Sequence, residues 1–287
     1  MTGKFIRDIV NLLIYGGAFI GLCASCITAL SFELTGQTEQ NLPYIFLRGS
    51  ATASLYALHR VVGLNKTAHL KTSERFSVIR KYQFHIRVYT VIWAMITLSL
   101  LASFNLSFML LLMPGGIIAL TYVIPFLSGG RRLRDLGWAK IVMIGFSWSW
   151  LTAVIPLGYF TGASIQMIVI HGLERMLFIM LLTIPFEIRD LHLDRSVGLI
   201  TIPEKLGRKR TFRIALLMCF AVIFLSAVAA FHYFNLAYMI AMSLTSLIVI
   251  PLIHYSYSIE DDYFFGGLMD GLMIAVLWIF LIANHFV

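Results

Sequence analysis

The chain has 287 residues, of which 59% are hydrophobic and only 13% are charged. An average soluble domain carries about 25% charged residues, so this composition excludes an ordinary water-soluble protein. The 14% aromatic content also excludes a disordered chain. The net charge of +8 does not indicate a nucleic-acid partner, because excess Lys and Arg in a membrane protein usually mark its cytoplasmic side. We therefore expect an all-α, polytopic membrane protein.

Nine apolar stretches are long enough to cross a bilayer as helices, which takes about 20 residues each. The first begins after Lys4 and Arg7 and is too long for a secretory signal, so we expect a retained first helix. Gly17, Gly21 and Ser25 in this stretch have the small-x-x-x-small spacing that allows two helices to pack closely. The nine stretches are 9–32, 43–63, 87–104, 107–127, 139–160, 165–186, 212–233, 235–256 and 267–286.

The loops between these stretches alternate between long basic segments and very short ones. Counting Arg87, Lys140 and Arg213 at the loop edges, 19 of the 22 Lys and Arg residues lie in the N-terminal segment and in the long loops 64–86, 128–138 and 187–211. The positive-inside rule then predicts that the N-terminus and the long loops are cytoplasmic and that the C-terminus is outside. In a bacterium this would be an integral protein of the inner membrane. Glu174 and Arg175 lie inside a predicted span, so each needs a polar partner on another helix.

Three carboxylates gather where the sixth stretch meets the following loop. If the helix continues through this segment, Glu187, Asp190 and Asp194 share one face at the spacing i, i+3, i+7. Carboxylates so placed repel one another, and a divalent cation between them would convert the repulsion into coordination. Mg²⁺ is the natural candidate, because it combines one or two carboxylates with water and phosphate oxygens. The alternative is a solvated loop in which the acids pair with Arg189 and Arg195.

The residues around these acids carry a resemblance to a known family. The segment from Asp190 to Gly207 reads D-x-x-x-D-R-x-x-G-x-x-T-I-P-x-x-L-G. It resembles the second aspartate-rich motif of the UbiA superfamily of intramembrane prenyltransferases. The stretch from Tyr122 to Leu127 with the basic residues after it is similar to that family's tyrosine-containing motif, and the stretch from Leu268 to Met273 is similar to its last helix.

The resemblance implies a single integral-membrane domain over residues 1–287, built as a nine-helix bundle. It also implies Mg²⁺-assisted transfer of an isoprenyl group from an isoprenyl diphosphate to a lipid-accessible acceptor. The metal ligands would be Asp190 and Asp194, with Glu187 directly bound or nearby. Tyr122 would orient the diphosphate or the acceptor, or it is an ordinary interface tyrosine. The positive funnel for the diphosphate would comprise Arg131, Arg132, Arg134, Arg189, Arg195 and Lys205.

The first aspartate-rich motif of the family is missing. Where that motif has Asn and three Asp residues, this chain has Leu55, Tyr56, His59 and Gly63. One of the two usual metal sites cannot be built in the usual way. Arg60, and with it His59, is a candidate for direct contact with phosphate oxygens, because a guanidinium matches them without a metal. The alternatives are a core histidine and an arginine that extends to the membrane interface.

The aromatic side chains of the predicted spans offer faces that can stabilise a carbocation. Ordinary helix packing or an interfacial belt is the favoured explanation for any single one of them. The candidates are Phe126, Phe146, Trp148 and Trp150.

Two other functions stay open besides a working transferase. One is a non-catalytic family member that binds isoprenyl diphosphate, because the first motif is absent. The other is a small-molecule transporter, which is disfavoured because the polar residues gather at one membrane face and not at the midplane.

Overall fold

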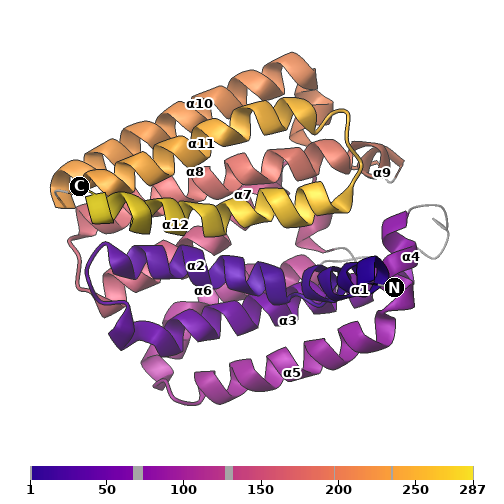
Figure 1. Cartoon of the computed structure of the whole chain (residues 1–287), viewed down its shortest axis with the longest axis horizontal. Helices are drawn as coiled ribbons and strands as arrows, with labels where there is room; N and C mark the ends of the chain where they lie inside the picture. Colours follow the sequence, from indigo (N-terminus) through magenta and orange to yellow (C-terminus); the bar gives the residue numbers. More distant parts are fainter. Residues whose placement is uncertain (1, 67–73, 127–131, 197, 234, 287) are drawn as a thin grey trace.

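The computed structural model describes residues 2–66, 74–126, 132–196, 198–233 and 235–286. Within these ranges the regular elements are all helices, and they form one elongated bundle (Figure 1). The predicted all-α membrane fold is confirmed. The first half of the chain forms α1 (Thr2–Tyr15), α2 (Ala18–Glu33), η1 (Glu39–Asn41), α3 (Leu42–Lys66), α4 (Glu74–Lys81), α5 (Gln83–Leu101), α6 (Leu106–Val123) and η3 (Leu133–Asp135).

The second half begins with a long span that changes its helical winding part of the way along. This span comprises α7 (Ala139–Ser149) and two π-helical segments, η4 (Trp150–Val154) and η5 (Pro156–Phe160). The last span likewise begins with a π-helical segment, η6 (Phe264–Met269), and continues as α12 (Asp270–Phe286). The remaining helices are α8 (Ile165–Arg189), α9 (Leu191–Ser196), α10 (Ile202–Tyr233, kinked at Gly207) and α11 (Leu236–Tyr255).

Each of the nine apolar stretches overlaps a long helix or a helical pair. By length and hydropathy, seven single helices in the described residues can cross a membrane, and the bent pair α1–α2 brings the number to eight. The remaining predicted span, 43–63, corresponds to α3, which does not meet the same hydropathy criterion. The predicted number of nine spans is therefore not confirmed, although α3 packs along α2 and α5 within the bundle.

The prediction of one continuous first helix is wrong, because the structure breaks this segment into two helices, α1 and α2. α1 and α2 meet at an angle of 56°. Gly17 lies between them with φ 84°, a left-handed conformation that a side chain would disfavour. A Cβ at Gly17 would also lie 2.3 Å from the carbonyl oxygen of Ala53. The bend thus depends on a close approach of the backbone to α3.

Small residues do join α2 to α3, as their spacing predicts. A Cβ on Gly21 would lie 2.7 Å from the Gly49 carbonyl oxygen, and one on Gly49 would lie 2.2 Å from Ser25 Oγ. The two backbones are therefore nearly in contact, which is how helices in a membrane gain packing energy without a hydrophobic drive between them.

The two chain termini lie at opposite ends of the bundle (Figure 1). The N-terminus, α4 and α9 lie at one end, and the C-terminus lies at the other. The segments predicted to be cytoplasmic are therefore at the same end of the bundle. Which side of a membrane this end faces stays a prediction.

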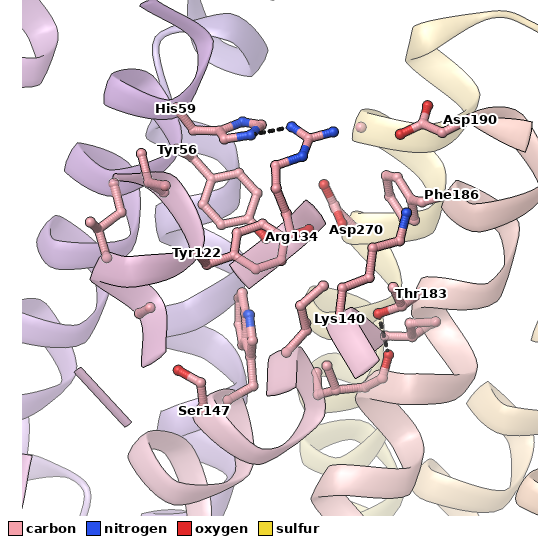
Figure 2. A pocket seen from close by; sticks show the side chains of 18 of the residues that line it. Tyr56, His59, Tyr122, Arg134, Lys140, Ser147, Thr183, Phe186, Asp190 and Asp270 are labelled. Atoms are coloured by element: carbon pink, nitrogen blue, oxygen red, sulfur yellow. Dashed lines mark hydrogen bonds between the residues drawn. The ribbon is translucent and has the colours of Figure 1, made fainter. Parts of the chain in front are cut away.

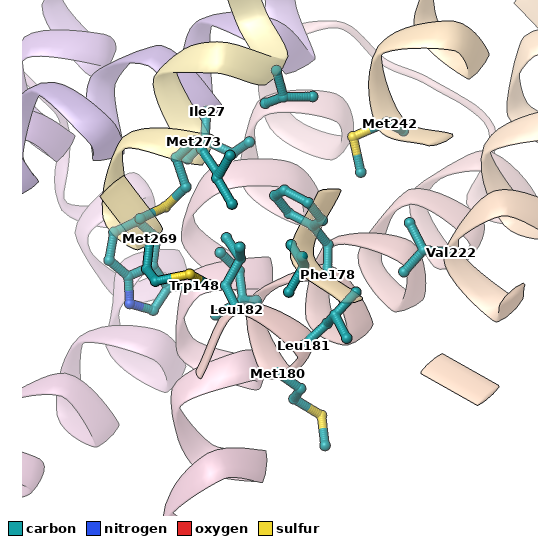
Figure 3. Packing of buried hydrophobic residues seen from close by; sticks show 14 of the residues in the cluster. Ile27, Trp148, Phe178, Met180, Leu181, Leu182, Val222, Met242, Met269 and Met273 are labelled. Atoms are coloured by element: carbon teal, nitrogen blue, oxygen red, sulfur yellow. The ribbon is translucent and has the colours of Figure 1, made fainter. Parts of the chain in front are cut away.

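α8 is the central helix of the largest packed cluster (Figure 3). Its side chains Phe178, Leu181 and Leu182 are almost completely buried. They pack among residues contributed by six other helical segments, namely Ile27, Trp148, Val222, Met242, Met269 and Met273. This packing fixes α8, whose last turn carries the acidic residues of the candidate site.

The charged pair on α8 finds its partners on other helices, as predicted. Arg175 is 1% exposed and donates hydrogen bonds to the Ile27 carbonyl oxygen at 2.6 Å and to Ser31 Oγ at 3.2 Å. Glu174 accepts a hydrogen bond from the hydroxyl of Tyr238. These contacts connect α8 to α2 and α11 inside the bundle.

Candidate functional site

A cavity of about 210 Å³ lies among α1, α3, α6, α7, α8 and the last span. Figure 2 shows side chains that line it. Its lining includes Glu187 and Asp190 at the end of α8 that leads into α9, and α9 lies at the same end of the bundle as the N-terminus (Figure 1). One part of its lining is apolar, and the other part carries four basic and four acidic side chains. The apolar part includes Ile118, Ile144, Trp148, Ile179, Leu182 and Met273. The charged part comprises Arg60, Arg134, Lys140, Arg189, Glu187, Asp190, Asp262 and Asp270.

Lys140 connects two of the predicted metal ligands. Its Nζ lies 3.0 Å from Oε1 of Glu187 and 2.7 Å from Oδ2 of Asp194. All three side chains are 5% exposed or less. Lys140 begins α7, so this contact joins α7 to the last turn of α8 and to α9. A buried ammonium held by two carboxylates is strongly constrained, because removing either partner leaves charge without compensation.

Arg189 connects a second pair of carboxylates in the same way. Its Nε lies 2.8 Å from Oδ1 of Asp190, and its Nη1 lies 3.3 Å from Oδ1 of Asp262. The guanidinium also lies over the rings of Phe186 and Phe265, at 5.2 and 5.0 Å from their centroids. The end of α8 is thereby tied to the segment that leads into η6.

The opposite side of the cavity carries basic residues from α3 and η3 (Figure 2). Nη1 of Arg134 lies 2.5 Å from Nε2 of His59. Arg60 donates a hydrogen bond to the carbonyl oxygen of Ile14 and lies 5.1 Å from the Tyr15 ring centroid. His59 and Arg60 thus line the cavity, as their proposed role in phosphate contact requires, and both also contact neighbouring elements, as the alternative interpretation requires.

A short turn places Arg134 and Lys140 on the same cavity. Asp135 accepts a hydrogen bond from the backbone N of Arg132 at 2.8 Å, which stabilises the single turn η3. Burial raises the pKa of Asp135, but this hydrogen bond and the neighbouring guanidinium outweigh it and leave the pKa below its usual 3.8. Gly137 follows with φ 62°, and a Cβ there would lie 2.4 Å from the Ile200 carbonyl oxygen. The chain therefore turns tightly between the two basic residues.

Asp270 lines the cavity, although the sequence pointed to it only as a candidate interhelix partner of the charged pair on α8 and not as a site residue. It begins α12, and Figure 2 shows it between the side that carries Tyr56 and Tyr122 and the side that carries Asp190. In the described part of the chain, no hydrogen bond or ion pair involves its carboxylate. A carboxylate within a predicted span is costly, and that cost is the sequence signal that points to Asp270.

The predicted three-carboxylate metal site is not formed. α8 ends at Arg189 and α9 begins at Leu191, so Glu187, Asp190 and Asp194 do not lie on one continuous helix face. Among the described residues there is no group of three His, Cys, Asp or Glu side chains that could hold a metal ion. Glu187 retains one buried oxygen, Oε2, without a hydrogen-bond partner. Its other oxygen, both oxygens of Asp190 and Oδ2 of Asp194 face basic side chains, so the arrangement does not fit a Mg²⁺ ion shared by the three.

Several other predicted site residues lie away from the cavity. Arg132 pairs with Asp135 at 3.3 Å, and Arg195 pairs with Glu204 at 3.2 Å on the surface. Lys205 is exposed and does not line the cavity. Arg131 lies outside the described residues. The structure thus brings together Glu187, Asp190, Tyr122, His59, Arg60, Arg134 and Arg189.

The four aromatic residues predicted as carbocation contacts differ in whether they line the cavity. Trp148 lines the cavity, whereas Phe146 and Trp150 do not, and their rings stack at 5.8 Å. Phe126 is 76% exposed. Only Trp148 is therefore placed to contact a ligand in this cavity.

No protein-family model and no curated protein matches this sequence. Solved structures do match it over nearly its whole length. A UbiA homologue from Aeropyrum pernix K1 matches with a TM-score of 0.60 and 19% identity, covering 95% of this chain and 97% of that one. A UbiA homologue from Archaeoglobus fulgidus, bound to GPP and Mg²⁺, matches with a TM-score of 0.57 and 15% identity, covering 94% and 99%.

A third similar structure is described as a digeranylgeranylglyceryl phosphate synthase in membranes. It matches with a TM-score of 0.59 and 14% identity, covering 98% of this chain and all of that chain. The chain therefore has the fold of UbiA membrane prenyltransferases, as the sequence resemblance predicts. At these identities the likeness defines the fold and leaves the activity to be argued from the cavity.

Proposed function

We propose that this protein is a UbiA-type membrane prenyltransferase that binds an isoprenyl diphosphate in the cavity and transfers its isoprenyl group to an acceptor. The observation that carries the proposal is the cavity itself, which joins a charged end to an apolar lining within this fold. An isoprenyl diphosphate has the same division, because its diphosphate is anionic and its chain is hydrocarbon.

The charged end supplies hydrogen-bond donors for a diphosphate. Arg134 forms no ion pair with an acidic residue in the described part of the chain, and its guanidinium can bind two phosphate oxygens at once. Lys140 and Arg189 lie across the cavity from it. The isoprenyl chain would then lie along Trp148, Ile179 and the other apolar residues of the lining.

The reaction requires that the bond between the allylic carbon and the diphosphate oxygen break, with both electrons leaving on the diphosphate. Guanidinium and ammonium groups that are already in place stabilise this developing charge. The acceptor then attacks the allylic carbon and loses a proton. Tyr122, as proposed from the sequence, lines the cavity where it can orient either reactant.

The orientation that we propose follows from the end of the bundle where the cavity lies. This end carries the N-terminus and the long basic segments, so the positive-inside rule assigns it to the cytoplasmic side. Water-soluble diphosphate headgroups would then reach the cavity from the cytoplasm, and the acceptor would come from the membrane.

The test is an assay of the purified protein with radiolabelled isoprenyl diphosphates of several lengths and a lipid extract as acceptor. We expect a prenylated product that disappears in Arg134→Gln, with Arg210→Gln, an exposed residue outside the cavity, as the matched control. Binding of the diphosphate without any product would instead identify a non-catalytic binding protein. Absence of binding to every chain length would refute the proposal.

A further inference from the structure

We propose that Lys140 is the built-in cation of the diphosphate site and that this chain binds isoprenyl diphosphate without requiring a divalent metal. The inference rests on the proposed function and concerns the same cavity. It starts from the position of the ammonium, which lies between Glu187 and Asp194 where the sequence predicts a metal ion.

The site has little room for both the Lys140 ammonium and a Mg²⁺ ion. Mg²⁺ binds carboxylate oxygens at 2.0–2.1 Å, and the Lys140 ammonium already lies 2.7 and 3.0 Å from one oxygen of each carboxylate. A Mg²⁺ ion bound to these same oxygens would therefore lie within a few ångströms of a positive charge, in a site that is almost closed to water. Repulsion between buried like charges is weakly screened, so the ammonium would have to leave.

Displacing the ammonium is also unfavourable for the protein. Lys140 is 5% exposed, and its two carboxylate partners come from α8 and α9. An ammonium that leaves them loses a hydrogen bond to Asp194 and an ion pair with Glu187, and a buried charge without partners is strongly destabilising. Glu187 and Asp194 thus act as positioning residues that hold the ammonium at the edge of the cavity.

The ammonium can still bind a ligand from this position. It has three N–H groups, of which one donates to Asp194 and at most one more faces Glu187 at 3.0 Å. Lys140 lines the cavity, and Figure 2 shows its side chain extending toward the space between Arg134 and Asp190. The third N–H group is therefore available for a phosphate oxygen.

A second basic side chain, Arg189, also lies where a metal ion would be expected to bind carboxylates. Arg189 lies between Asp190 and Asp262 as Lys140 lies between its two carboxylates. On the opposite side, Tyr56, His59 and Arg134 line the cavity near the missing first motif, and none of them is a carboxylate. The sequence resemblance leads us to expect metal ions at two places. At both of them, side chains of the protein supply hydrogen-bond donors for a phosphate.

The experiment is calorimetric binding of geranyl diphosphate to the purified full chain, with excess EDTA and with excess MgCl₂. We expect the two dissociation constants to agree within about threefold. Lys140→Met should weaken binding in EDTA by about tenfold or more, and Mg²⁺ should restore part of the loss, because Glu187 and Asp194 are then free to bind it. Lys209→Met, at an exposed site outside the cavity, should behave like the unmodified protein.

Two further measurements keep the inference separate from folding and from the proposed function. MgCl₂ should raise the thermal midpoint of Lys140→Met but not of the unmodified chain, and Lys140→Arg should retain binding in EDTA. If EDTA abolishes binding by the unmodified chain, or if Lys140→Met binds as well as that chain in EDTA, the inference is wrong. If geranyl diphosphate and longer homologues bind under neither condition, the proposed function fails instead.

Discussion

The guanidinium of Arg134 lies 2.5 Å from the imidazole of His59, although 75 positions separate the two residues in the sequence. This contact joins α3, where the first aspartate-rich motif is missing, to the turn η3 that follows α6. The position that would carry a carboxylate in that motif therefore meets a basic residue from another segment, and the cavity gains a donor on this side.

Replacing Arg134 should weaken diphosphate binding. A hydrogen bond to a charged group contributes about 1.5–3 kcal/mol, so we expect Arg134→Gln to lower the affinity for geranyl diphosphate by at least about tenfold. Calorimetry on the purified variant measures this, with Arg210→Gln as the control. Equal affinities for Arg134→Gln and the unmodified protein would place the diphosphate elsewhere.

Replacing Asp270 should have the opposite effect on binding. Asp270→Asn removes a negative charge from a cavity that must accept an anion, so geranyl diphosphate should bind several-fold more tightly, within about 1 kcal/mol. We expect prenyl transfer to fall at the same time if the carboxylate takes the proton that the acceptor loses. Separate measurement of the dissociation constant and the turnover rate tests both effects. Weaker binding would show that Asp270 instead organises the neighbouring cations.

Replacing Arg175 should destabilise the bundle without any ligand being involved. Arg175→Met removes the donors to Ile27, Ser31 and Thr152 and leaves buried acceptors without partners. We expect a loss of about 2 kcal/mol, measured as a lower thermal midpoint in detergent. The exposed Arg213→Met should leave the midpoint unchanged, and a similar shift in both variants would contradict the packing role.

The close approach of α2 and α3 should tolerate no added methyl group. A Cβ on Gly21 would lie 2.7 Å from a backbone oxygen of Gly49, whereas one on Gly116 would meet no atom within 4 Å. We expect Gly21→Ala to cost about 1–3 kcal/mol and Gly116→Ala to be neutral or slightly stabilising, because alanine favours helix. Thermal unfolding of the two variants in the same detergent provides the comparison.

Asp135 should stabilise the turn η3 in a way that depends on pH. Its pKa is lower in the folded protein than its usual 3.8, so its contribution is present above about pH 4 and is lost as the pH falls through the folded value. The thermal midpoints of the unmodified protein and Asp135→Asn should therefore differ by a constant amount between about pH 5 and pH 7. The difference should shrink below about pH 4, and one that grows on acidification would contradict the assignment.

Most of the fold could be predicted because spans are specified by local composition. Long apolar segments such as 165–186 reveal their helices without any tertiary information. The break at Gly17 could not be predicted in this way, because it depends on the approach of Ala53, which is far along the chain. The hydropathy of α3 is reduced by polar residues such as Arg48, His59 and Arg60, so the membrane span at 43–63 stays a prediction.

The candidate site could be predicted only in part, for the same reason. Glu187 and Asp190 stand out in sequence and do line the cavity. The basic partner of Glu187 and Asp194 could not be found there, because Lys140 is 54 residues from Asp194 and its place in the sequence is the edge of the basic loop 128–138. A motif shows which carboxylates are close together along the chain, whereas the charge that neutralises them is a tertiary contact.

The π-helical segment η6 immediately before Asp270 gives the last span a tolerance to length that its composition does not reveal. A π-helical turn is wider than an α-helical one, because its hydrogen bonds join residues five apart. Removing one residue from Phe264–Met269 can therefore be absorbed by tightening this turn to an α-helical one, which keeps Asp270 and Asp262 in register. Removing one residue from the start of α12 cannot be absorbed in this way and would rotate the following side chains by about 100°, so single-residue gaps among natural relatives should fall within Phe264–Met269 and not within α12.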